Sequence, residues 1–266
     1  MQHSQRRPTG PFHKKAKLIL PTQALLLGPG GHLVQHRSLA DLLLLGRHHQ
    51  HQYQHQQSQA TARLPGFQQV VAYEAGFAAL TPAGDVYTWG DERYAACLGR
   101  DVSSSSSPSS SSSSSYPQGS GSGSVSPAGL PAPVAALRDL PTGPVVKVAA
   151  GGYLLAALTA GQDLYVWGGH PGRRALLAGV GDEPVPVDIG GRDIADVAVG
   201  ESHVVVLAAG GEVFVIGNNA NGQLGLPDKS VESWTRVGLD LQDGQRAVGV
   251  AAGPRNTFIM VQKKTT

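Results

Sequence analysis

Apolar residues in this chain gather in pairs of short runs, and each pair is joined by a polar turn that contains glycine. Two such pairs are Ala78–Leu80 with Val86–Trp89, and Val204–Leu207 with Val213–Ile216. Short β-branched and aromatic runs on either side of a Gly-containing turn are typical of β-hairpins. Gly84 and Gly211 occupy the same place in the two turns, where the backbone favours a positive φ. The pattern therefore predicts an all-β chain.

A hairpin with fixed internal spacing recurs along the chain. Its fixed positions are Tyr73–Leu80–Trp89, Gly151–Leu158–Trp167, Gly200–Leu207–Ile216 and Gly253–Met260. The anchors Leu158 and Leu207 are 49 residues apart, and Leu207 and Met260 are 53 apart. Leu80 and Leu158 are 78 apart, but a serine-rich insert lies between them. A repeat of this period indicates a propeller or a solenoid.

Weaker apolar segments precede each hairpin. They are Val134, Val187 and Val237, followed by Val146–Ala149, Val197–Val199 and Val248–Ala251. Four short strands per period correspond to one propeller blade. We therefore predict an all-β fold of β-propeller blades, each with four short antiparallel strands, in an incomplete ring of about 3.5 to 4 recognisable repeats.

The third repeat carries the most specific motif. It reads Val197-Ala198-Val199-Gly200-Glu201-Ser202-His203, then Leu207, Gly217 and Gly222-Gln223-Leu224-Gly225. This pattern resembles the regulator of chromosome condensation repeat, which β-lactamase-inhibitor-like propellers share, and the resemblance spans roughly residues 70–264. His203 has no histidine counterpart in the other repeats, and Ile216 replaces the tryptophan of the first two.

Composition divides the chain into a leader, a repeat region and an insert. The predicted boundaries are a mostly disordered leader at 1–63, repeat units near 64–101, 129–180, 181–232 and 233–266, and a disordered loop insertion at 102–128. In the insertion, twelve of the thirteen residues from Ser103 to Ser115 are serine. A propeller of this family is expected to close about seven blades. The shortfall has three explanations: a truncated chain, divergent blades in the leader, or two paired copies. We favour the first, because 1–63 show no blade pattern.

The leader concentrates the positive charge of the chain. Residues 1–63 contain eight Lys or Arg and one Asp, and eight of the ten histidines. An acid-poor basic leader fits a mitochondrial transit peptide, a loose nuclear signal such as Arg6-Arg7 with Lys14-Lys15-Ala16-Lys17, a weak nucleic-acid contact, or a tail with no address. No apolar run approaches the length of a membrane span. Cys97 is the only cysteine, so we expect an intracellular protein, either cytoplasmic or nuclear, with mitochondrial targeting left open.

The sequence offers no arrangement typical of catalysis, a cofactor or a metal. His203 is interpreted as a framework residue of the repeat. The 217–228 segment has the spacing of a calcium loop but lacks its first carboxylate and its final glutamate, and the His-rich tract at 48–55 has no fixed geometry.

The segments that follow each third-strand glycine are predicted to form exposed loops on one rim. The candidate interaction residues are Asp91, Glu92, Arg93, Tyr94, His170, Arg173, Arg174, Asn218, Asn219 and Asn221. Loops on a rigid scaffold commonly carry binding, and ordinary solvated loops are the alternative. We predict a non-enzymatic scaffold that binds a protein partner through these loops. The resemblance implies as an alternative a guanine-nucleotide exchange factor or regulator of a small GTPase, associated with chromatin.

Overall fold

The computed structural model describes residues 16–20, 23–27, 31, 33–36, 64–103, 126–227 and 230–263. The chain divides into two units, Met1–Phe67 and Gln68–Thr266. The His-rich tract at 48–55 and the serine-rich run lie outside the described residues, apart from Ser103.

The first unit contains a three-stranded antiparallel sheet in the order β1-β2-β3. Its strands are β1 (Ala16–Leu20), β2 (Gln23–Leu27) and β3 (Leu33–His36). Leu18 of β1 lies opposite Leu25 of β2, and Leu26 lies opposite Val34 of β3. These strands were not predicted within the leader, which was expected to be mostly disordered, because the alternating pattern that reveals a half-buried strand is absent from the apolar runs of β1 and β2.

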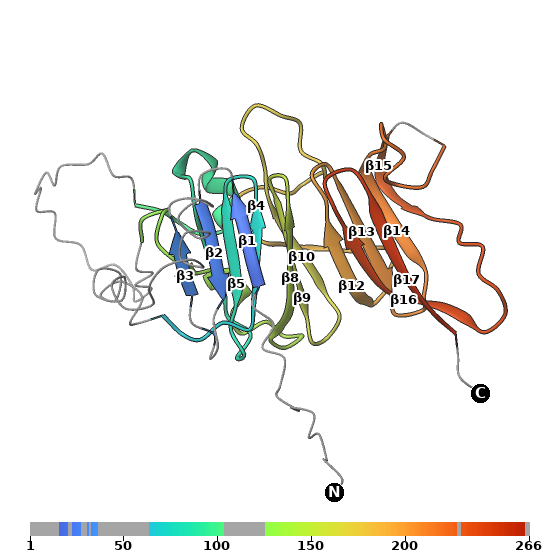
Figure 1. The fold of residues 1–266 in the computed structure, drawn as a ribbon, viewed down its shortest axis with the longest axis horizontal. Helices are drawn as coiled ribbons and strands as arrows, with labels where there is room; N and C mark the ends of the chain where they lie inside the picture. Colours follow the sequence, from blue (N-terminus) through green and yellow to red (C-terminus); the bar gives the residue numbers. More distant parts are fainter. Residues whose placement is uncertain are drawn as a thin grey trace, which may run out of the picture. The chain divides into compact units, whose positions relative to one another are not determined.

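The second unit is built from three four-stranded antiparallel sheets and one two-stranded sheet. Figure 1 shows them side by side in chain order, coloured from cyan to red. The first sheet holds β4 (Gln69–Tyr73), β5 (Gly76–Leu80), β6 (Val86–Gly90) and β7 (Ala132–Pro133). The second holds β8 (Val145–Gly151), β9 (Leu154–Thr159), β10 (Leu164–Gly168) and β11 (Val185–Val187). The third holds β12 (Ile194–Val199), β13 (His203–Ala208), β14 (Val213–Asn218) and β15 (Ser230–Arg236). The fourth pairs β16 (Gln245–Ala252) with β17 (Thr257–Lys263).

The predicted all-β fold of four-stranded antiparallel blades is confirmed by these sheets. The hydrogen-bonded sheets are offset by one strand from the repeat units defined in the sequence, because β7, β11 and β15 each close the sheet before them. Gly84 and Gly211 adopt φ values of +95° and +94° in the predicted hairpin turns. Two 3₁₀ helices, η2 (Glu92–Leu98) and η3 (Ala135–Leu137), lie between the strands of the first two blades.

The core lies between neighbouring sheets. One buried cluster joins Ala78, Leu80 and Val86 of the first blade to Leu155, Ala157 and Trp167 of the second. Equivalent clusters join the second blade to the third and the third to the fourth. The repeat glycines permit this close approach, since a Cβ on Gly151 would lie 2.5 Å from the Gly200 carbonyl oxygen. Each of the first three blades therefore buries its anchor, Leu80, Leu158 or Leu207, against the next blade along the chain.

The first strands of the blades are held together by side chains at one equivalent position, which we call the clasp: Gln69, Lys147 and Asp196. They lie opposite the anchors Leu80, Leu158 and Leu207. Gln69 Oε1 accepts a hydrogen bond from Val148 N at 3.0 Å, and its Nε2 donates to Val148 O at 2.7 Å.

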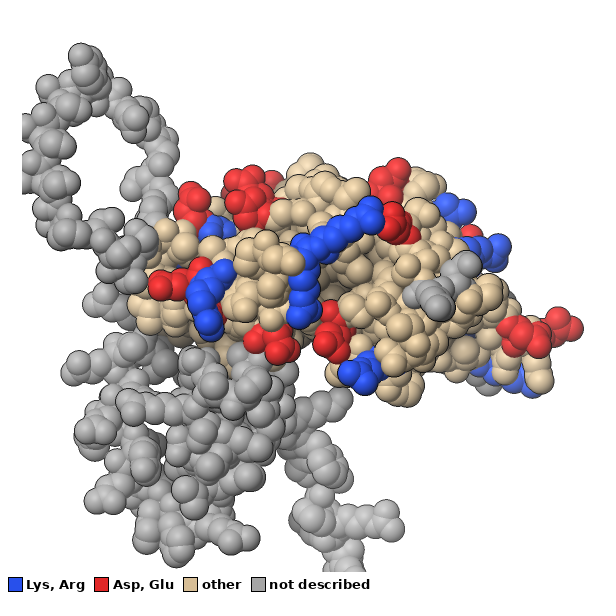
Figure 2. All heavy atoms as spheres, turned by 90° about the horizontal axis from the view of Figure 1, so that it is seen from above, with Lys and Arg blue, Asp and Glu red and all other residues tan. Residues whose placement is uncertain are grey.

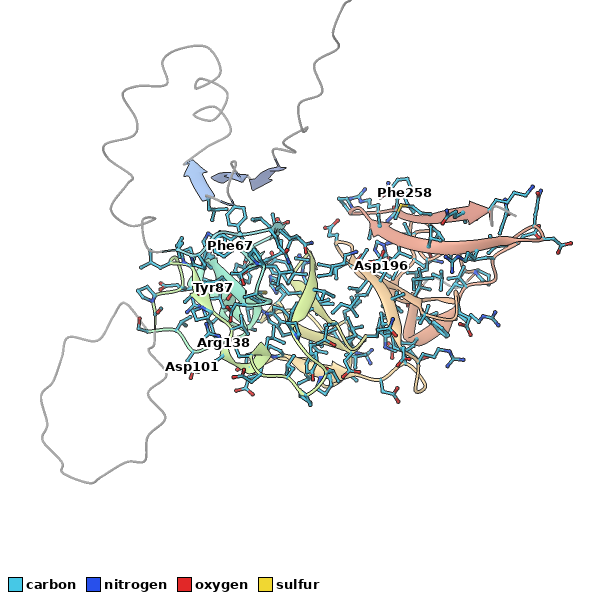
Figure 3. All side chains as sticks on the ribbon, turned by 90° about the horizontal axis from the view of Figure 1, so that it is seen from below. Phe67, Tyr87, Asp101, Arg138, Asp196 and Phe258 are labelled. Atoms are coloured by element: carbon cyan, nitrogen blue, oxygen red, sulfur yellow. The ribbon has the colours of Figure 1, made fainter. Side chains whose placement is uncertain are left out.

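Asp196 links three blades at the clasp. It forms an ion pair with Lys147, its Oδ1 accepts from Val197 N at 2.9 Å, and its Oδ2 accepts from Val250 N at 2.9 Å. Figure 3 labels Asp196 in the region between the sheets. Three inner strands are therefore joined by polar bonds as well as by apolar packing.

Arg100 closes the base of the serine-rich insertion. Its guanidinium donates to the carbonyl oxygens of Thr88, Asp101, Ser126, Pro127 and Leu130 at 3.0–3.3 Å. Val102 and Ser126 form a parallel bridge, and Ser103 N donates to Ser126 O at 3.4 Å. The two ends of the insertion thus meet at the blade. Residues 126–128, predicted to belong to the insertion, are part of this junction, and Ala128 is buried.

Candidate functional site

In the first candidate loop, η2 begins and ends at defined caps. The Asp91 side chain accepts a hydrogen bond from Arg93 N at 3.0 Å, and Gly99 ends the helix in the left-handed region. The Cys97 carbonyl oxygen accepts from Trp167 Nε1 at 3.1 Å, and the buried Cys97 thiol donates to Tyr153 O at 3.3 Å. These contacts fix η2 of the first blade against the second blade.

Three rings meet beside η2 and form an aromatic cluster: Tyr94, Tyr153 and His170. The Tyr94 and Tyr153 ring centroids lie 4.9 Å apart, and Tyr94 and His170 lie 5.4 Å apart. Tyr153 and His170 meet edge to face at 4.7 Å, a favourable aromatic geometry. All three rings remain partly exposed, so the cluster offers a ring surface to solvent.

Two arginines border the aromatic cluster. The Arg173 guanidinium lies 5.6 Å from the Tyr153 ring centroid, and the Arg93 guanidinium lies 5.8 Å from that of Tyr94. Arg93 is also held by Asp91 at 2.5 Å, and this hydrogen bond lowers the pKa of the Asp91 carboxyl. Arg173 is exposed and has no carboxylate within ion-pair distance among the described residues. A cation held over an aromatic face, with its charge uncompensated, is suited to contact with a partner.

The structure therefore joins four of the predicted residues, Arg93, Tyr94, His170 and Arg173, with Asp91 as the cap. Glu92 is exposed on the same helix. Tyr153 was not predicted from the sequence, because it stands in the β8–β9 turn, where the other three repeats carry Ala75, Ser202 and Arg255. The repeat pattern therefore contains no residue type at this position that could have identified Tyr153 as a site residue.

Arg174 points to the third blade instead. Its Nη1 and Nη2 donate to the two carboxylate oxygens of Glu232 at 2.6 and 3.1 Å. Both side chains are largely exposed, so the pair contributes little stability. Arg174 lies outside the aromatic cluster and bridges two blades at the surface.

The asparagine segment after β14 divides into exposed and buried residues. Asn218 and Asn221 are exposed, whereas Asn219 is buried with 6% of its surface accessible. Its Nδ2 donates to Leu226 O, and its Oδ1 accepts from Leu224 N, both at 2.7 Å. The prediction that Asn219 lies in an exposed contact loop is therefore wrong, because its amide satisfies the backbone of the turn.

Charges of both signs are interspersed on the end of the blades that carries these loops. Figure 2 shows basic and acidic side chains alternating across this face. The described part of this face therefore has no electrostatic potential of a single sign. The features that distinguish it are the three partly exposed rings and Arg173, which has no carboxylate partner in the part of the chain that the structure describes.

His203 serves the framework between the third and fourth blades. It is fully buried, and its Nε2 lies 2.9 Å from Thr257 Oγ1. Burial lowers the pKa of His203, and the Asn256 backbone partly offsets this effect.

The lowered pKa of His203 predicts a pH-dependent loss of stability. Below about pH 6.5 the unfolded chain takes up the proton before the folded one does, so stability present above this pH is lost as pH falls. We expect the free energy of unfolding to fall more steeply between pH 7 and pH 5 in the unmodified protein than in His203→Gln. Denaturant titrations at several pH values measure both slopes, and parallel curves would contradict the assignment.

Among the described residues, no group of three or more His, Cys, Asp or Glu is arranged to hold a metal ion. Within the same ranges, no helix has the length and apolar character of a membrane span.

Two family models match the C-terminal part of the chain. Both describe the regulator of chromosome condensation (RCC1) repeat, one at residues 194–223 and the other at 210–260. These segments cover the third and fourth blades, including the motif around His203.

Curated relatives share this repeat. The chain is 33% identical to the Arabidopsis thaliana RCC1 domain-containing protein RUG3, mitochondrial, over 152 residues, which are 56% of this chain and 29% of that protein. It is 29% identical to the Drosophila melanogaster regulator of chromosome condensation over 135 residues, 48% of this chain and 23% of the relative. The matched segments thus span less than a third of either relative.

Solved structures agree on the fold. Human WBSCR16 superposes with a TM-score of 0.58 at 17% identity, covering 100% of this chain and 62% of that one. Prp20p from Saccharomyces cerevisiae, whose structure was described with its binding to Gsp1p and histones, superposes with a TM-score of 0.60 at 17% identity. This chain is covered to 97% and Prp20p to 58%. At these identities the similarity establishes the fold.

Proposed function

We propose that this chain, which belongs to the RCC1-like β-propeller proteins, is a non-enzymatic scaffold that binds a protein partner through the aromatic cluster and its two arginines. The observation that carries the proposal is the uncompensated, exposed Arg173 guanidinium above the Tyr153 ring. Tyrosine and arginine are, with tryptophan, the residues enriched at interaction hot spots. The hydrogen bond from Trp167 Nε1 to the Cys97 carbonyl holds η2, which carries Tyr94, against the second blade. We therefore expect binding to cost little conformational entropy in the side chains of the cluster.

Comparative capture tests this proposal. Full-length protein, Arg173→Glu and the control Arg246→Glu serve as baits; Arg246 is an exposed cation near the start of β16, away from the cluster. We expect at least one protein that binds the unmodified chain and the Arg246 variant but not Arg173→Glu. If Arg173→Glu retains every binding protein, the cluster is not the contact surface.

A second candidate function is regulation of a small GTPase. It is favoured by the similarity to the Drosophila regulator of chromosome condensation and to Prp20p, whose structure was described with its binding to Gsp1p and histones. The test is release of fluorescent GDP from a panel of purified small GTPases. Acceleration of release by the full chain would support an exchange function, and no acceleration from any GTPase would count against it.

For the compartment we propose an intracellular protein, addressed by the basic leader. The relatives include a mitochondrial protein and a regulator of chromosome condensation, so the two destinations to distinguish are mitochondrion and nucleus. A fusion of residues 1–63 to a fluorescent protein reports the address directly. A diffuse cytoplasmic signal would show that the leader is not an address.

A further inference from the structure

A cavity of about 350 Å³ lies where the chain passes from the first blade to the second. Its lining comes from three segments: residues 83–85 of the β5–β6 turn, residues 137–140 from the end of η3 onward, and residues 143–144 before β8. The aromatic cluster lies at the other end of the strands, because Tyr94 follows β6 whereas the β5–β6 turn precedes it. This volume is at the lower end of the range for ligand pockets, so it suits a single side chain better than a large cofactor.

Backbone geometry shapes the walls of this cavity. Gly84 packs against Pro144, and a Cβ on this glycine would lie 2.5 Å from the Pro144 Cβ. Asp139 has a φ of +52°, a left-handed conformation that residues other than glycine seldom adopt. A hydrogen bond from Gly143 N to Leu140 O at 3.0 Å closes the turn that follows it. Because non-glycine residues in this conformation cluster at functional sites, Asp139 is a candidate binding residue.

The charged side chains of the lining favour a cation. Arg138 Nε donates to Asp85 Oδ1 at 2.9 Å, and the other carboxylate oxygen of Asp85 accepts no hydrogen bond from the described residues. Asp139 is exposed and forms no ion pair within the described part of the chain. The lining therefore carries two carboxylates and one guanidinium, a net charge of −1. This balance attracts an incoming cation and repels an anion.

Apolar groups share the cavity with these charges. Leu137 is buried and Leu140 is half-buried, and both line the cavity together with Pro144. A hydrated metal ion would contact the carboxylates but would gain nothing from these apolar groups. A lysine or arginine side chain matches both, because its methylene stem packs on apolar surface while its charged end stays near water.

We propose that this cavity binds a lysine or arginine side chain of a protein partner. The methylene stem packs on Leu137 and Leu140, and the charged end reaches Asp139 and the second carboxylate oxygen of Asp85. Arg138 holds Asp85 but also repels the incoming cation, so it limits the affinity of the site. The cavity is a second contact surface, distinct from the aromatic cluster at the other end of the blades.

A nuclear magnetic resonance titration of the full chain tests this site. The probe is the peptide acetyl-Gly-Arg-Gly-amide, whose capped ends leave the guanidinium as its only charge. We expect saturable shifts of the Asp85, Asp139 and Leu140 amides, with a dissociation constant on the order of 1 mM, because a single exposed charge pair contributes little. The uncharged acetyl-Gly-Gln-Gly-amide should shift none of them. No saturable shift with the arginine peptide, or stronger binding of acetyl-Gly-Glu-Gly-amide, overturns the proposal.

Two substitutions should change the affinity for the arginine peptide in opposite directions. Asp139→Asn removes the charge but keeps a side chain that tolerates the left-handed backbone, so binding should weaken about two- to five-fold with an unchanged melting temperature. Arg138→Gln removes the competing cation, so binding should tighten by a similar factor.

The opposite signs separate a charge effect from a loss of folding, which would weaken binding in both variants. The control Asp243→Asn, at an exposed aspartate outside the cavity, should bind the arginine peptide as the unmodified chain does. Unchanged binding by Asp139→Asn, or weaker binding by Arg138→Gln, overturns the proposal. Neither result would affect the proposal for the aromatic cluster, because neither residue belongs to it.

Discussion

Replacing Trp167 by alanine is expected to lower the free energy of unfolding by roughly 3–5 kcal/mol. Trp167 is fully buried in the cluster between the first two blades, and its Nε1 donates to the Cys97 carbonyl. The substitution empties a large volume at this interface and leaves the carbonyl of η2 without its donor. Denaturant-induced unfolding of the full chain measures the change.

Trp89, at the equivalent position of the first blade, provides the matched comparison. It is as buried as Trp167 and stacks on Phe77 at a centroid distance of 5.5 Å, but its Nε1 has no acceptor among the described residues. Trp167→Ala should cost more than Trp89→Ala, since only the former also breaks a hydrogen bond. The phenylalanine variants keep most of the apolar volume and isolate that bond, so Trp167→Phe should cost about 1–3 kcal/mol more than Trp89→Phe. Equal losses in the phenylalanine pair would show that the Cys97 bond contributes nothing.

Replacing Asp196 by alanine is expected to cost about 2–3 kcal/mol, the second largest effect. The change leaves Val250 N without its acceptor and Lys147 without its counter-ion at a half-buried site. The partial exposure of Lys147 keeps the loss below that of a deeply buried ion pair. Thermal and denaturant melts of Asp196→Ala measure it against Asp240→Ala, an exposed aspartate.

A double substitution separates the ion pair from the backbone bonds. If the Lys147–Asp196 pair matters by itself, Lys147→Met combined with Asp196→Ala should cost less than the sum of the two single losses. Strict additivity would assign the whole effect to the hydrogen bonds that Asp196 accepts from Val197 and Val250.

The blade framework could be predicted from the sequence because apolar packing repeats at fixed offsets. Leu80, Leu158, Leu207 and Met260 occupy one structural position, so their spacing was visible as a period. The clasp could not be found this way, because the same position carries Gln69, Lys147 and Asp196, then Gly249. Three chemically different side chains join the first strands of neighbouring blades at this position. A pattern of residue types does not reveal that they share one geometry.

The location of the candidate surface could be predicted from the sequence, but the residues that form it could not all be predicted. Loops that follow the third strands were expected to share a rim, and Tyr94, His170 and Arg173 do come together. Asn219 could not be distinguished from its exposed neighbours in the sequence, yet both ends of its side-chain amide form hydrogen bonds with the backbone of its own turn. Whether a polar side chain faces solvent or satisfies a turn depends on local backbone geometry, which single-residue chemistry does not encode.

The Arg100 junction gives the chain a natural grafting position. Ser103 N donates a hydrogen bond to Ser126 O at 3.4 Å, so the two ends of the segment 104–125 are already adjacent at the blade, and a change in its length is expected to cost little loop-closure entropy. A folded module with adjacent termini could replace 104–125 without altering a single strand pair. A fluorescent protein or an epitope placed there would follow this protein in cells while the basic leader and the aromatic cluster stay unmodified.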